Sequence, residues 1–336
     1  MKVLIVTVAG ISSRFNRDTS RNVLKCLYYE DSPTHSLLYQ IVCKVLDFER
    51  VIIVGGYLYD ELVMYAEKYL SNLGPQIELV YNAHYKDYGS GYSLIKGVER
   101  VPEVANEIIF VEGDLYFDNE SFSLVKKSLY DVITVNHEFI TSEKAVALYV
   151  DEIDKVHYIY DTNHSLLSIP SPIKAIYNSG QIWKFTSLSK LNSVISLLSP
   201  KQIQGTNLEI IQAYFDNIPV SDLNFIALNT WFNCNTVADY QKVMKNINEK
   251  LALLQGKIEN NSPIVIMIIG LGSVGLYLLD YLLSLSDPQL RIVVVGRNSE
   301  KMLKDVNIVK TAATIRKQLQ SKIFIESECD LDSIQT

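Results

Sequence analysis

The stretch KVLIVTVAGISSRF, residues 2–15, decides the fold. Its first half, residues 2–8, is a short apolar run rich in β-branched side chains, which predicts a buried strand. The run passes directly into a turn that contains Gly10. Such a turn exposes backbone N–H groups at the carboxyl end of the strand, where doubly wound α/β folds bind their ligands. The stretch therefore predicts the first strand of an α/β sheet, with a ligand site directly after it.

Polar side chains that suit a phosphate group follow this strand. Ser12 and Ser13 supply hydroxyl donors, and the guanidinium of Arg14 matches the geometry of phosphate oxygens. Lys25 follows farther along. The alternatives are an ion pair between Arg14 and a local carboxylate, and a solvated surface position for Lys25. The pattern GxxxxGK of P-loop NTPases is absent from the turn, so the segment predicts a phosphate site of another kind.

Predicted strands and helices alternate over about the first 255 residues. Apolar runs typical of buried strands lie at residues 50–54, 76–81, 107–111 and 131–136. Amphipathic stretches at 35–45 and 60–70 space their apolar residues as a helix face does. Strands that alternate with helices imply right-handed crossovers. The predicted fold class is therefore α/β with a mostly parallel sheet.

The pattern changes between residues 144 and 185. Short runs there predict a small antiparallel insert with a turn at 161–164, and the runs are 146–150, 156–160 and 181–185. Farther on, Thr236 and Asp239 have the spacing of a capping box, which predicts the start of a helix.

A polar, turn-rich stretch at residues 256–263 predicts a domain boundary. A chain of 336 residues suggests about two domains. We therefore expect one domain at 1–256, a linker at 257–262 and a second domain at 263–336.

Composition excludes several classes of protein. Lys and Arg number 31 against 38 Asp and Glu, and the net charge of −7 argues against a general nucleic-acid binder. The four cysteines form no CxxC pair, so neither a zinc ribbon nor a disulfide framework is indicated, and we expect a cytoplasmic protein. The apolar stretch 263–285 is long enough to span a bilayer, but it contains Asp280 and a glycine motif that explains it better, so we expect no membrane partner.

Four further segments place polar residues at strand ends or helix starts. They are NAHYKDYGSGYSL (82–94), EIIFVEGDLYF (107–117), AIYNSGQIW (175–183) and WFNCNTVADY (231–240). Together with residues 8–15, and in this order, they resemble the sugar-phosphate nucleotidyltransferases with a glycosyltransferase-A-like fold. Within that family the resemblance is to the cytidylyltransferases of the phosphocholine and alditol-phosphate kind. It covers about residues 1–255.

The resemblance implies a metal site and a nucleotide site at this edge of the sheet. The family's Gly-Asp carboxylate holds Mg²⁺ against the nucleotide phosphates, and here it is Asp114. Many members have a second carboxylate where this chain has Asn235. Lys25 would bind the α-phosphate, while Arg14 and the loop amides would hold the β- and γ-phosphates. The residues implied in nucleotide binding are Ala9, Gly10, Ser12, Ser13, Asn82, Gly89, Ser90 and Ser93.

On the acceptor side, the resemblance implies Asn178 and Tyr177. The chain also departs from the family pattern, since no proline follows Lys25 and the first loop lacks a second glycine. Most of these candidates have structural alternatives. Asp114, Ser90, Ser93 and Asn235 are residue types that cap helices, and Asn178 is typical of a turn.

The implied reaction transfers a nucleotidyl group, with CTP as the expected donor, to a phosphorylated alditol or sugar and releases pyrophosphate. The product would be a CDP-alditol for a surface polysaccharide. Phosphocholine is the alternative acceptor, and a non-catalytic nucleotide-binding regulatory module is the alternative function. A glycosyltransferase would normally need Asp-x-Asp, whereas this chain has Asp114-Leu-Tyr116. The oligomeric state is open, and a homo-oligomer is one possibility.

The stretch IVIMIIGLGSVG, residues 264–275, is an apolar strand followed by GxGxxG. A helical pattern follows it, and this context makes Gly270, Gly272 and Gly275 candidates for dinucleotide binding. The next predicted strand ends at Arg297 where NAD-binding domains place a carboxylate, which favours NADP.

This part resembles the start of a Rossmann domain of the malate and lactate dehydrogenase type, over residues 263–336 only. The catalytic residues of that family would lie beyond this point. We therefore expect an incomplete Rossmann domain without reductase activity, from a truncated bifunctional protein or as a remnant that binds a nucleotide or a partner.

Overall fold

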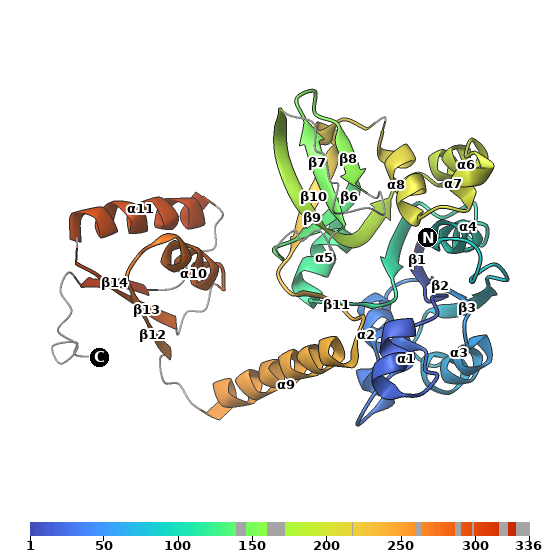
Figure 1. Ribbon diagram of the computed structural model, residues 1–336, viewed down its shortest axis with the longest axis horizontal. Coiled ribbons are helices and arrows are strands. Elements are labelled where there is room, and N and C mark those ends of the chain that lie inside the picture. The colour runs from blue at the N-terminus through green and yellow to red at the C-terminus, as the bar shows by residue number, and fades with distance from the viewer. Residues whose placement is uncertain are drawn as a thin grey trace. The chain divides into compact units, whose positions relative to one another are not determined.

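A computed structural model gives the structure of residues 1–138, 146–159, 172–216, 218–259, 264–285, 290–297, 299–315 and 322–326. The chain divides into two compact units, Met1–Asn246 and Ile247–Thr336 (Figure 1). The predicted turn at 161–164 lies outside the described residues.

The sheet of the first unit is built around β1 (Lys2–Thr7). Its order is β10-β6-β9-β4-β1-β2-β3, and β7 and β8 extend it beside β9. Around β1, the strands β2 (Arg50–Gly55), β3 (Gln76–Tyr81) and β4 (Glu107–Glu112) are all parallel. Farther out, β6 (Asp131–Asn136) and β10 (Leu223–Leu228) are parallel to each other. The predicted α/β class with a mostly parallel sheet is confirmed.

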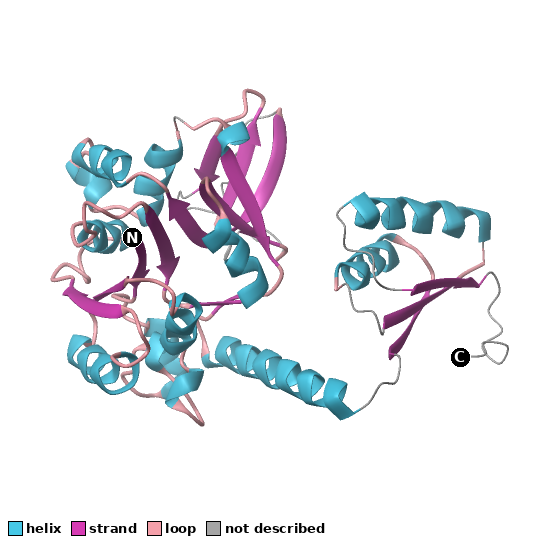
Figure 2. Ribbon diagram, turned by 180° about the vertical axis from the view of Figure 1, so that it is seen from behind, coloured by secondary structure: helices cyan, strands magenta, loops and turns pink. Residues whose placement is uncertain are grey.

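Helices cover both faces of this sheet (Figures 1 and 2). Along β1, Val3 and Ile5 belong to one apolar cluster, and Leu4 and Val6 to another. Since successive side chains of a strand point to opposite faces, a continuous apolar run needs a core on each side. The helices are α1 (Ser13–Thr19), α2 (Leu37–Val42), α3 (Tyr59–Tyr65), α4 (Ser90–Val98), α5 (Asn119–Lys127), α6 (Leu188–Ser196), α7 (Pro200–Ile203) and α8 (Asn207–Phe215).

Short helical turns complete this unit. The predicted helix at 35–45 is broken into α2 and two flanking 3₁₀ turns, and the predicted helix at 60–70 is α3 followed by a π-helical turn. The 3₁₀ turns are Lys25–Leu27, Pro33–His35, Cys43–Val45 and Val220–Asp222, and the π-helical turn is Ala66–Leu70.

The antiparallel insert consists of β7 (Ala147–Asp151), β8 (Val156–Ile159) and the outer part of β9 (Ile173–Phe185). The sequence predicts only the last five residues of β9 as strand and a turn at Asn178. The structure differs, because Asn178 pairs with Asn136 of β6 on one side and with Ala147 of β7 on the other. Two neighbouring strands hold this segment extended in spite of its turn-forming residue types.

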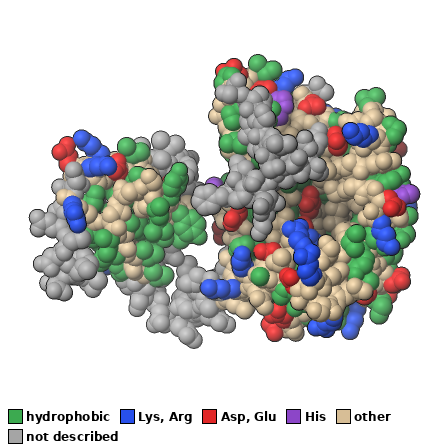
Figure 3. All heavy atoms as spheres, in the orientation of Figure 1, with side chains coloured by type: hydrophobic (Ala, Val, Ile, Leu, Met, Phe, Trp, Pro, Cys, Tyr) green, Lys and Arg blue, Asp and Glu red, His purple; other side chains and the backbone are tan. Residues whose placement is uncertain are grey.

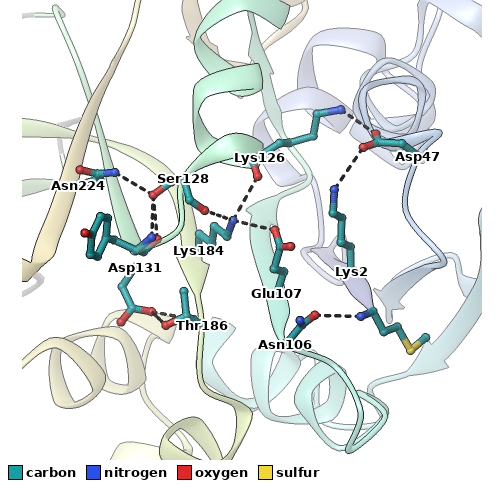
Figure 4. Close-up of polar contacts among 12 residues, drawn as sticks. Lys2, Asp47, Asn106, Glu107, Lys126, Ser128, Asp131, Lys184, Thr186 and Asn224 are labelled. Carbon is teal, nitrogen blue, oxygen red and sulfur yellow. Dashed lines mark hydrogen bonds and ion pairs between the residues drawn. The ribbon is translucent and has the colours of Figure 1, made fainter.

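A buried lysine ties three elements of the first unit together (Figure 4). Lys184 on β9 is 1% exposed. Its ammonium group donates to Glu107 Oε2 on β4 at 2.8 Å, and to the carbonyl oxygens of Lys126 and Ser128 at the end of α5. An ammonium group can be buried at low cost only when its donors are satisfied in this way.

The last helix of the first unit is α9 (Val237–Glu259), which continues into the second unit. Its start is the predicted capping box, in which Asp239 Oδ2 accepts from the Thr236 N–H and Thr236 Oγ1 accepts from the Asp239 N–H. The helix runs through Gly256 to Glu259, so the first three residues of the expected linker are helical. A single glycine within a long helix costs only about 1 kcal/mol, which is too little to end it.

The second unit contains a three-stranded parallel sheet, with β13 (Leu290–Val295) between β12 (Ile264–Ile269) and β14 (Lys322–Glu326). The helices α10 (Ser273–Ser284) and α11 (Ser299–Ile315) lie on one side of it (Figures 1 and 2). The apolar stretch 263–285 is thus a strand, a turn and a helix. Within the described residues, no helix is long and apolar enough to cross a membrane.

Candidate active site

A pocket of about 220 Å³ lies at the carboxyl ends of β1 and β4. The turn after β1, the 3₁₀ turn at Lys25, the segment 82–93 and the residues after β4 form its walls. The predicted site residues that line it are Ala9, Gly10, Ser12, Lys25, Asn82, Gly89, Ser90, Ser93 and Asp114. The structure therefore brings together most of the predicted nucleotide-binding residues from four separate segments.

The turn after β1 is fixed by its own polar side chains. Ser12 has a left-handed backbone (φ 56°), and its hydroxyl accepts a hydrogen bond from the Lys25 N–H at 3.2 Å. Asn16 donates to the carbonyl oxygen of Ile11 at 2.9 Å and accepts from the Val23 N–H at 2.8 Å. These contacts join the turn to the segment that carries Lys25, so hydrogen bonds within the chain fix the two walls of the pocket relative to each other.

The centre of the site is a contact among three residues that are far apart in the sequence. Lys25 Nζ lies 2.6 Å from Asp114 Oδ2 and 3.0 Å from Asn235 Oδ1. The side chains of Lys25 and Asp114 are 19% and 18% exposed, so the ion pair is shielded from most of the solvent.

Backbone packing explains how Asp114 and Asn235 reach this point. Gly113 lies against β1, where a Cβ atom would come 2.3 Å from Val8 Cγ1 and 2.9 Å from the carbonyl oxygen of Thr7. Only glycine fits there, and it places Asp114 beside the end of β1. The strands β5 (Leu115–Phe117) and β11 (Trp231–Asn233) then pair antiparallel and bring Asn235 alongside.

Asp114 and Asn235 fit a magnesium ion that is bound partly by its substrate. Their oxygens already converge on one positive charge, the ammonium of Lys25. In the part of the chain that the structure describes, no three His, Cys, Asp or Glu residues form a metal cluster. Mg²⁺ commonly takes one or two carboxylates and fills its shell with water and substrate phosphates. The donor set therefore suits Mg²⁺ bound together with a nucleotide.

Glu112 is a pocket residue that the sequence analysis missed. It is the last residue of β4 and accepts hydrogen bonds from Asn207 Nδ2 at 2.7 Å and Gln181 Nε2 at 3.1 Å. Burial and the neighbouring Asp114 carboxylate raise the pKa of Glu112 to about 7, against the opposing effects of Asn207 and Lys25. The signal that could have identified it is its position as an acidic residue at the end of an otherwise apolar strand, two residues before Asp114.

The segment 82–93 closes the pocket on another side. Asn82 Nδ2 donates to Ser93 Oγ at 2.9 Å, and Asn82 Oδ1 accepts from the His84 N–H at 2.8 Å. Asn82 and Ser93, both predicted from the sequence, are buried, and their hydrogen bonds stabilise the conformation of this segment. Tyr85 and Tyr88, which were not predicted, present aromatic rings at the pocket wall.

Several predicted residues do not line this pocket, among them Asn235, which contacts the pocket residue Lys25. Ser13 and Arg14 are exposed on the first turn of α1. Tyr177 packs against Phe225 with ring centroids 5.6 Å apart, and Asn178 donates weakly to the carbonyl oxygen of Glu138 at 3.4 Å. The implied roles of Arg14 in phosphate binding and of Asn178 and Tyr177 in acceptor binding stay predictions.

Other pocket residues were not predicted. Thr7, Val8, Leu24, Cys26 and Gly113 complete the lining. Burial raises the pKa of the Cys26 thiol, so this cysteine is a packing residue rather than a nucleophile.

Charges of both signs are interspersed over the visible face of this unit (Figure 3).

In the second unit, the glycine motif joins β12 to α10. Gly270 has φ +82°, and its N–H donates to the carbonyl oxygen of Val295 at 2.7 Å. A Cβ atom at Gly275 would lie 2.4 Å from the carbonyl oxygen of Gly270, so the turn is too tight for a larger residue. Gly272 is the N-cap of α10. Arg297 follows β13, the strand that pairs with β12, and is exposed.

Solved structures share the fold of the first unit. The inositol-1-phosphate CTP transferase of T. maritima is 18% identical with a TM-score of 0.51, over 71% of this chain and 91% of that one. The CTP:phosphocholine cytidylyltransferase of Streptococcus pneumoniae is 20% identical with a TM-score of 0.51, over 74% and 100%. The nucleoside-diphosphate-sugar pyrophosphorylase of Vibrio cholerae RC9 is 13% identical with a TM-score of 0.54, over 72% and 99%.

These similarities confirm the predicted nucleotidyltransferase fold, and at such identities they establish the fold alone. No curated protein matches the sequence. A family model described as "Domain of unknown function (DUF6564)" matches residues 21–247.

Proposed function

The chain belongs to the DUF6564 family, and from the pocket of its first unit we propose that it is a nucleotidyltransferase. It transfers a nucleotidyl group from a nucleoside triphosphate to a small phosphorylated acceptor and releases pyrophosphate.

The observation that carries this proposal is the convergence of Lys25, Asp114 and Asn235 at the carboxyl edge of β1 and β4. A positive charge and a carboxylate that line the pocket meet an amide oxygen beside a turn with a glycine. Phosphoryl and nucleotidyl transfer depend on positioning and charge neutralisation rather than on a protein nucleophile. The site offers both in one pocket.

The reaction is an in-line substitution at the α-phosphorus. An oxygen of the acceptor's phosphate forms the new P–O bond, and the bond to the β-phosphate oxygen breaks, so pyrophosphate leaves with the electron pair. The acceptor phosphate is already ionised at neutral pH, so no general base is needed. The ammonium of Lys25 neutralises the charge that develops on the α-phosphate.

Two further groups of the chain contribute. The backbone N–H groups of the turn after β1 would bind the terminal phosphates, as such turns commonly bind anions. Asp114 and Asn235 would hold Mg²⁺, which supplies charge neutralisation at the nucleotide phosphates when it is bound.

CTP is the proposed donor, and a phosphorylated alditol or sugar is the proposed acceptor. The names of two structurally similar proteins, a CTP transferase and a CTP-dependent cytidylyltransferase, support the choice of CTP. The second of them names phosphocholine, which is the alternative acceptor. The product would be an activated precursor of a surface polysaccharide.

A non-catalytic nucleotide-binding module is the second candidate function. The observation in its favour is Asn235, because an amide is a weaker magnesium ligand than a carboxylate. Such a module would bind nucleotides in the same pocket and release no pyrophosphate.

For the second unit we propose binding of a dinucleotide, with NADP favoured over NAD. The tight turn at Gly270 and Gly275, the helix that begins after Gly272 and the position of Arg297 support this proposal. Titration with NADPH and NADH, followed by nucleotide fluorescence, tests it. Equal and weak binding of both would contradict it.

The test of the main proposal is pyrophosphate release by the full chain with Mg²⁺, each of the four ribonucleoside triphosphates and a panel of acceptors. The panel contains ribitol, mannitol, glycerol and choline phosphates and glucose 1-phosphate. Release that requires CTP and one acceptor supports the proposal and identifies the acceptor. Nucleotide binding without release for any pair favours the non-catalytic module.

A further inference from the structure

A carboxylate in the pocket has no part in the reaction described above. Glu112 lines the pocket two residues before Asp114, and amide groups hold both of its oxygens. Asn207 Nδ2 donates to Oε1 at 2.7 Å, and Gln181 Nε2 donates to Oε2 at 3.1 Å. A carboxylate offers about four acceptor sites, so these two bonds leave further acceptor capacity for a ligand.

An oriented chain of amides connects Glu112 to Lys25. Lys25 Nζ donates to Asn235 Oδ1, and Asn235 Nδ2 donates to Asn233 Oδ1 at 2.6 Å. Asn233 Nδ2 then donates to Gln181 Oε1 at 3.3 Å, and Gln181 Nε2 donates to Glu112. Each amide accepts on one side and donates on the other. Because the ammonium group of Lys25 can only donate, it fixes the direction of every hydrogen bond in this series of amides. The last amide, Gln181, therefore donates to Glu112, and Glu112 must accept.

The other amide that binds Glu112, that of Asn207, also has a fixed orientation. Asn207 is 2% exposed, and its Oδ1 accepts from Ser90 Oγ at 3.1 Å. Its carbonyl oxygen is therefore occupied, and its NH₂ group faces Glu112. Both neighbours thus keep Glu112 in place as a hydrogen-bond acceptor.

The ligand group that faces Glu112 must therefore donate hydrogen bonds. A phosphate is disfavoured in direct contact with Glu112, because the carboxylate would repel it. The substrates of the proposed reaction carry hydroxyl groups, on the ribose of the nucleotide or on the acceptor. Resting on that proposed function, we propose that Glu112 is a specificity-determining residue that accepts hydrogen bonds from substrate hydroxyl groups.

Calorimetric binding to the full chain tests the proposal in the presence of Mg²⁺. The nucleotide series consists of the four ribonucleoside triphosphates with their 2′-deoxy and 3′-deoxy forms. The acceptor series pairs ribitol 5-phosphate and glycerol 3-phosphate with ethyl phosphate, which lacks free hydroxyl groups. Each series is measured with the wild type, with Glu112→Gln and with Glu120→Gln, an exposed control on α5.

We expect the wild type and Glu120→Gln to prefer the hydroxyl-bearing ligand at least 10-fold in one series at pH 8. That preference should be small in Glu112→Gln. The series that shows the effect identifies the source of the hydroxyl group. The same preference in the wild type and in Glu112→Gln, in both series, would overturn the proposal.

Two further outcomes separate this inference from the proposed function. If Glu112→Gln does not fold, the ligand preference of the wild type decides, and the absence of any preference for hydroxyl-bearing ligands in both series overturns the inference. Hydroxyl-dependent binding without pyrophosphate release supports the role of Glu112 and contradicts only the proposed reaction. Pyrophosphate release without any hydroxyl preference supports the proposed reaction and contradicts only the role of Glu112.

Discussion

The ammonium group of Lys25 lies 2.6 Å from the carboxylate of Asp114, across a gap of 89 residues in the sequence. Asp114 follows β4, and Lys25 is held by the turn after β1, so the pairing of two adjacent parallel strands creates the contact. The two charges are available to a nucleotide because the pair lines the pocket. A phosphate that enters would replace the carboxylate as the partner of Lys25.

Replacing Lys25 tests its proposed role at the α-phosphate. Lys25→Met keeps the unbranched shape and most of the length of the side chain and removes its charge. We expect a loss of about 100-fold or more in kcat, as for other groups that stabilise a transition-state charge. The assay is pyrophosphate release. Lys127→Ala, an exposed lysine on α5, is the control and should retain full activity. Equal rates in the wild type and in Lys25→Met would remove Lys25 from the mechanism.

The proposed magnesium ligands predict opposite effects on metal dependence. Asp114→Asn removes the carboxylate, so it should abolish turnover or demand much more Mg²⁺. Asn235→Asp adds a second carboxylate beside it, so it should lower the Mg²⁺ concentration for half-maximal rate several-fold. Chelation by EDTA should stop the wild-type reaction. An unchanged Mg²⁺ dependence in both variants would contradict this assignment.

Two glycines at the same sheet edge should respond differently to alanine. A Cβ atom at Gly113 would collide with Val8 and Thr7, so Gly113→Ala should lower the free energy of unfolding by about 1–3 kcal/mol. No atom lies within 4 Å of the corresponding position at Gly10. Gly10→Ala should therefore leave stability nearly unchanged and weaken nucleotide binding, because Gly10 lines the pocket. Chemical unfolding and nucleotide titration measure the two effects.

The raised pKa of Glu112 predicts how stability changes with pH. Above about pH 4.5 the carboxyl ionises in the unfolded chain while the folded chain still holds its proton, so this group lowers stability as pH rises to about 7. Glu112→Gln cannot ionise. Its melting temperature relative to the wild type should therefore increase between pH 5 and pH 8, and a constant difference would contradict the shifted pKa.

The buried lysine of Figure 4 predicts a large stability effect away from the pocket. Lys184→Met removes the ammonium group and leaves Glu107 and two carbonyl oxygens without their donor. We expect a loss of about 3–5 kcal/mol in the free energy of unfolding, as when one partner of a buried ion pair is removed. Adding Glu107→Gln should recover part of the loss, because the uncompensated charge is then gone. Urea unfolding of both variants provides the measurement.

The elements that position the pocket could largely be predicted from local sequence. β1 and β4 are continuous apolar runs, and Gly113 with Asp114 stands out at the end of the second one. The capping box at Thr236 marked the start of α9. In these cases the signal is contained in neighbouring residues, so it does not depend on tertiary contacts.

Other features depend on contacts that local sequence does not encode. Arg14 follows phosphate-suited residues, yet Phe15 occupies the inward face of α1 and Arg14 is exposed. Asn178 is a residue type that is typical of turns, but β6 and β7 pair with it on both sides. The role of Gln181 in holding Glu112 follows from the register of β9, which only the folded sheet determines.

The most direct test of the central claim is acceptor-dependent pyrophosphate release with CTP and Mg²⁺ by the wild type, Lys25→Met and Asp114→Asn. We predict turnover by the wild type with one phosphorylated acceptor and a loss of about 100-fold or more in both variants. Binding of CTP by the wild type without pyrophosphate release from any acceptor, or equal turnover in all three proteins, would contradict the account.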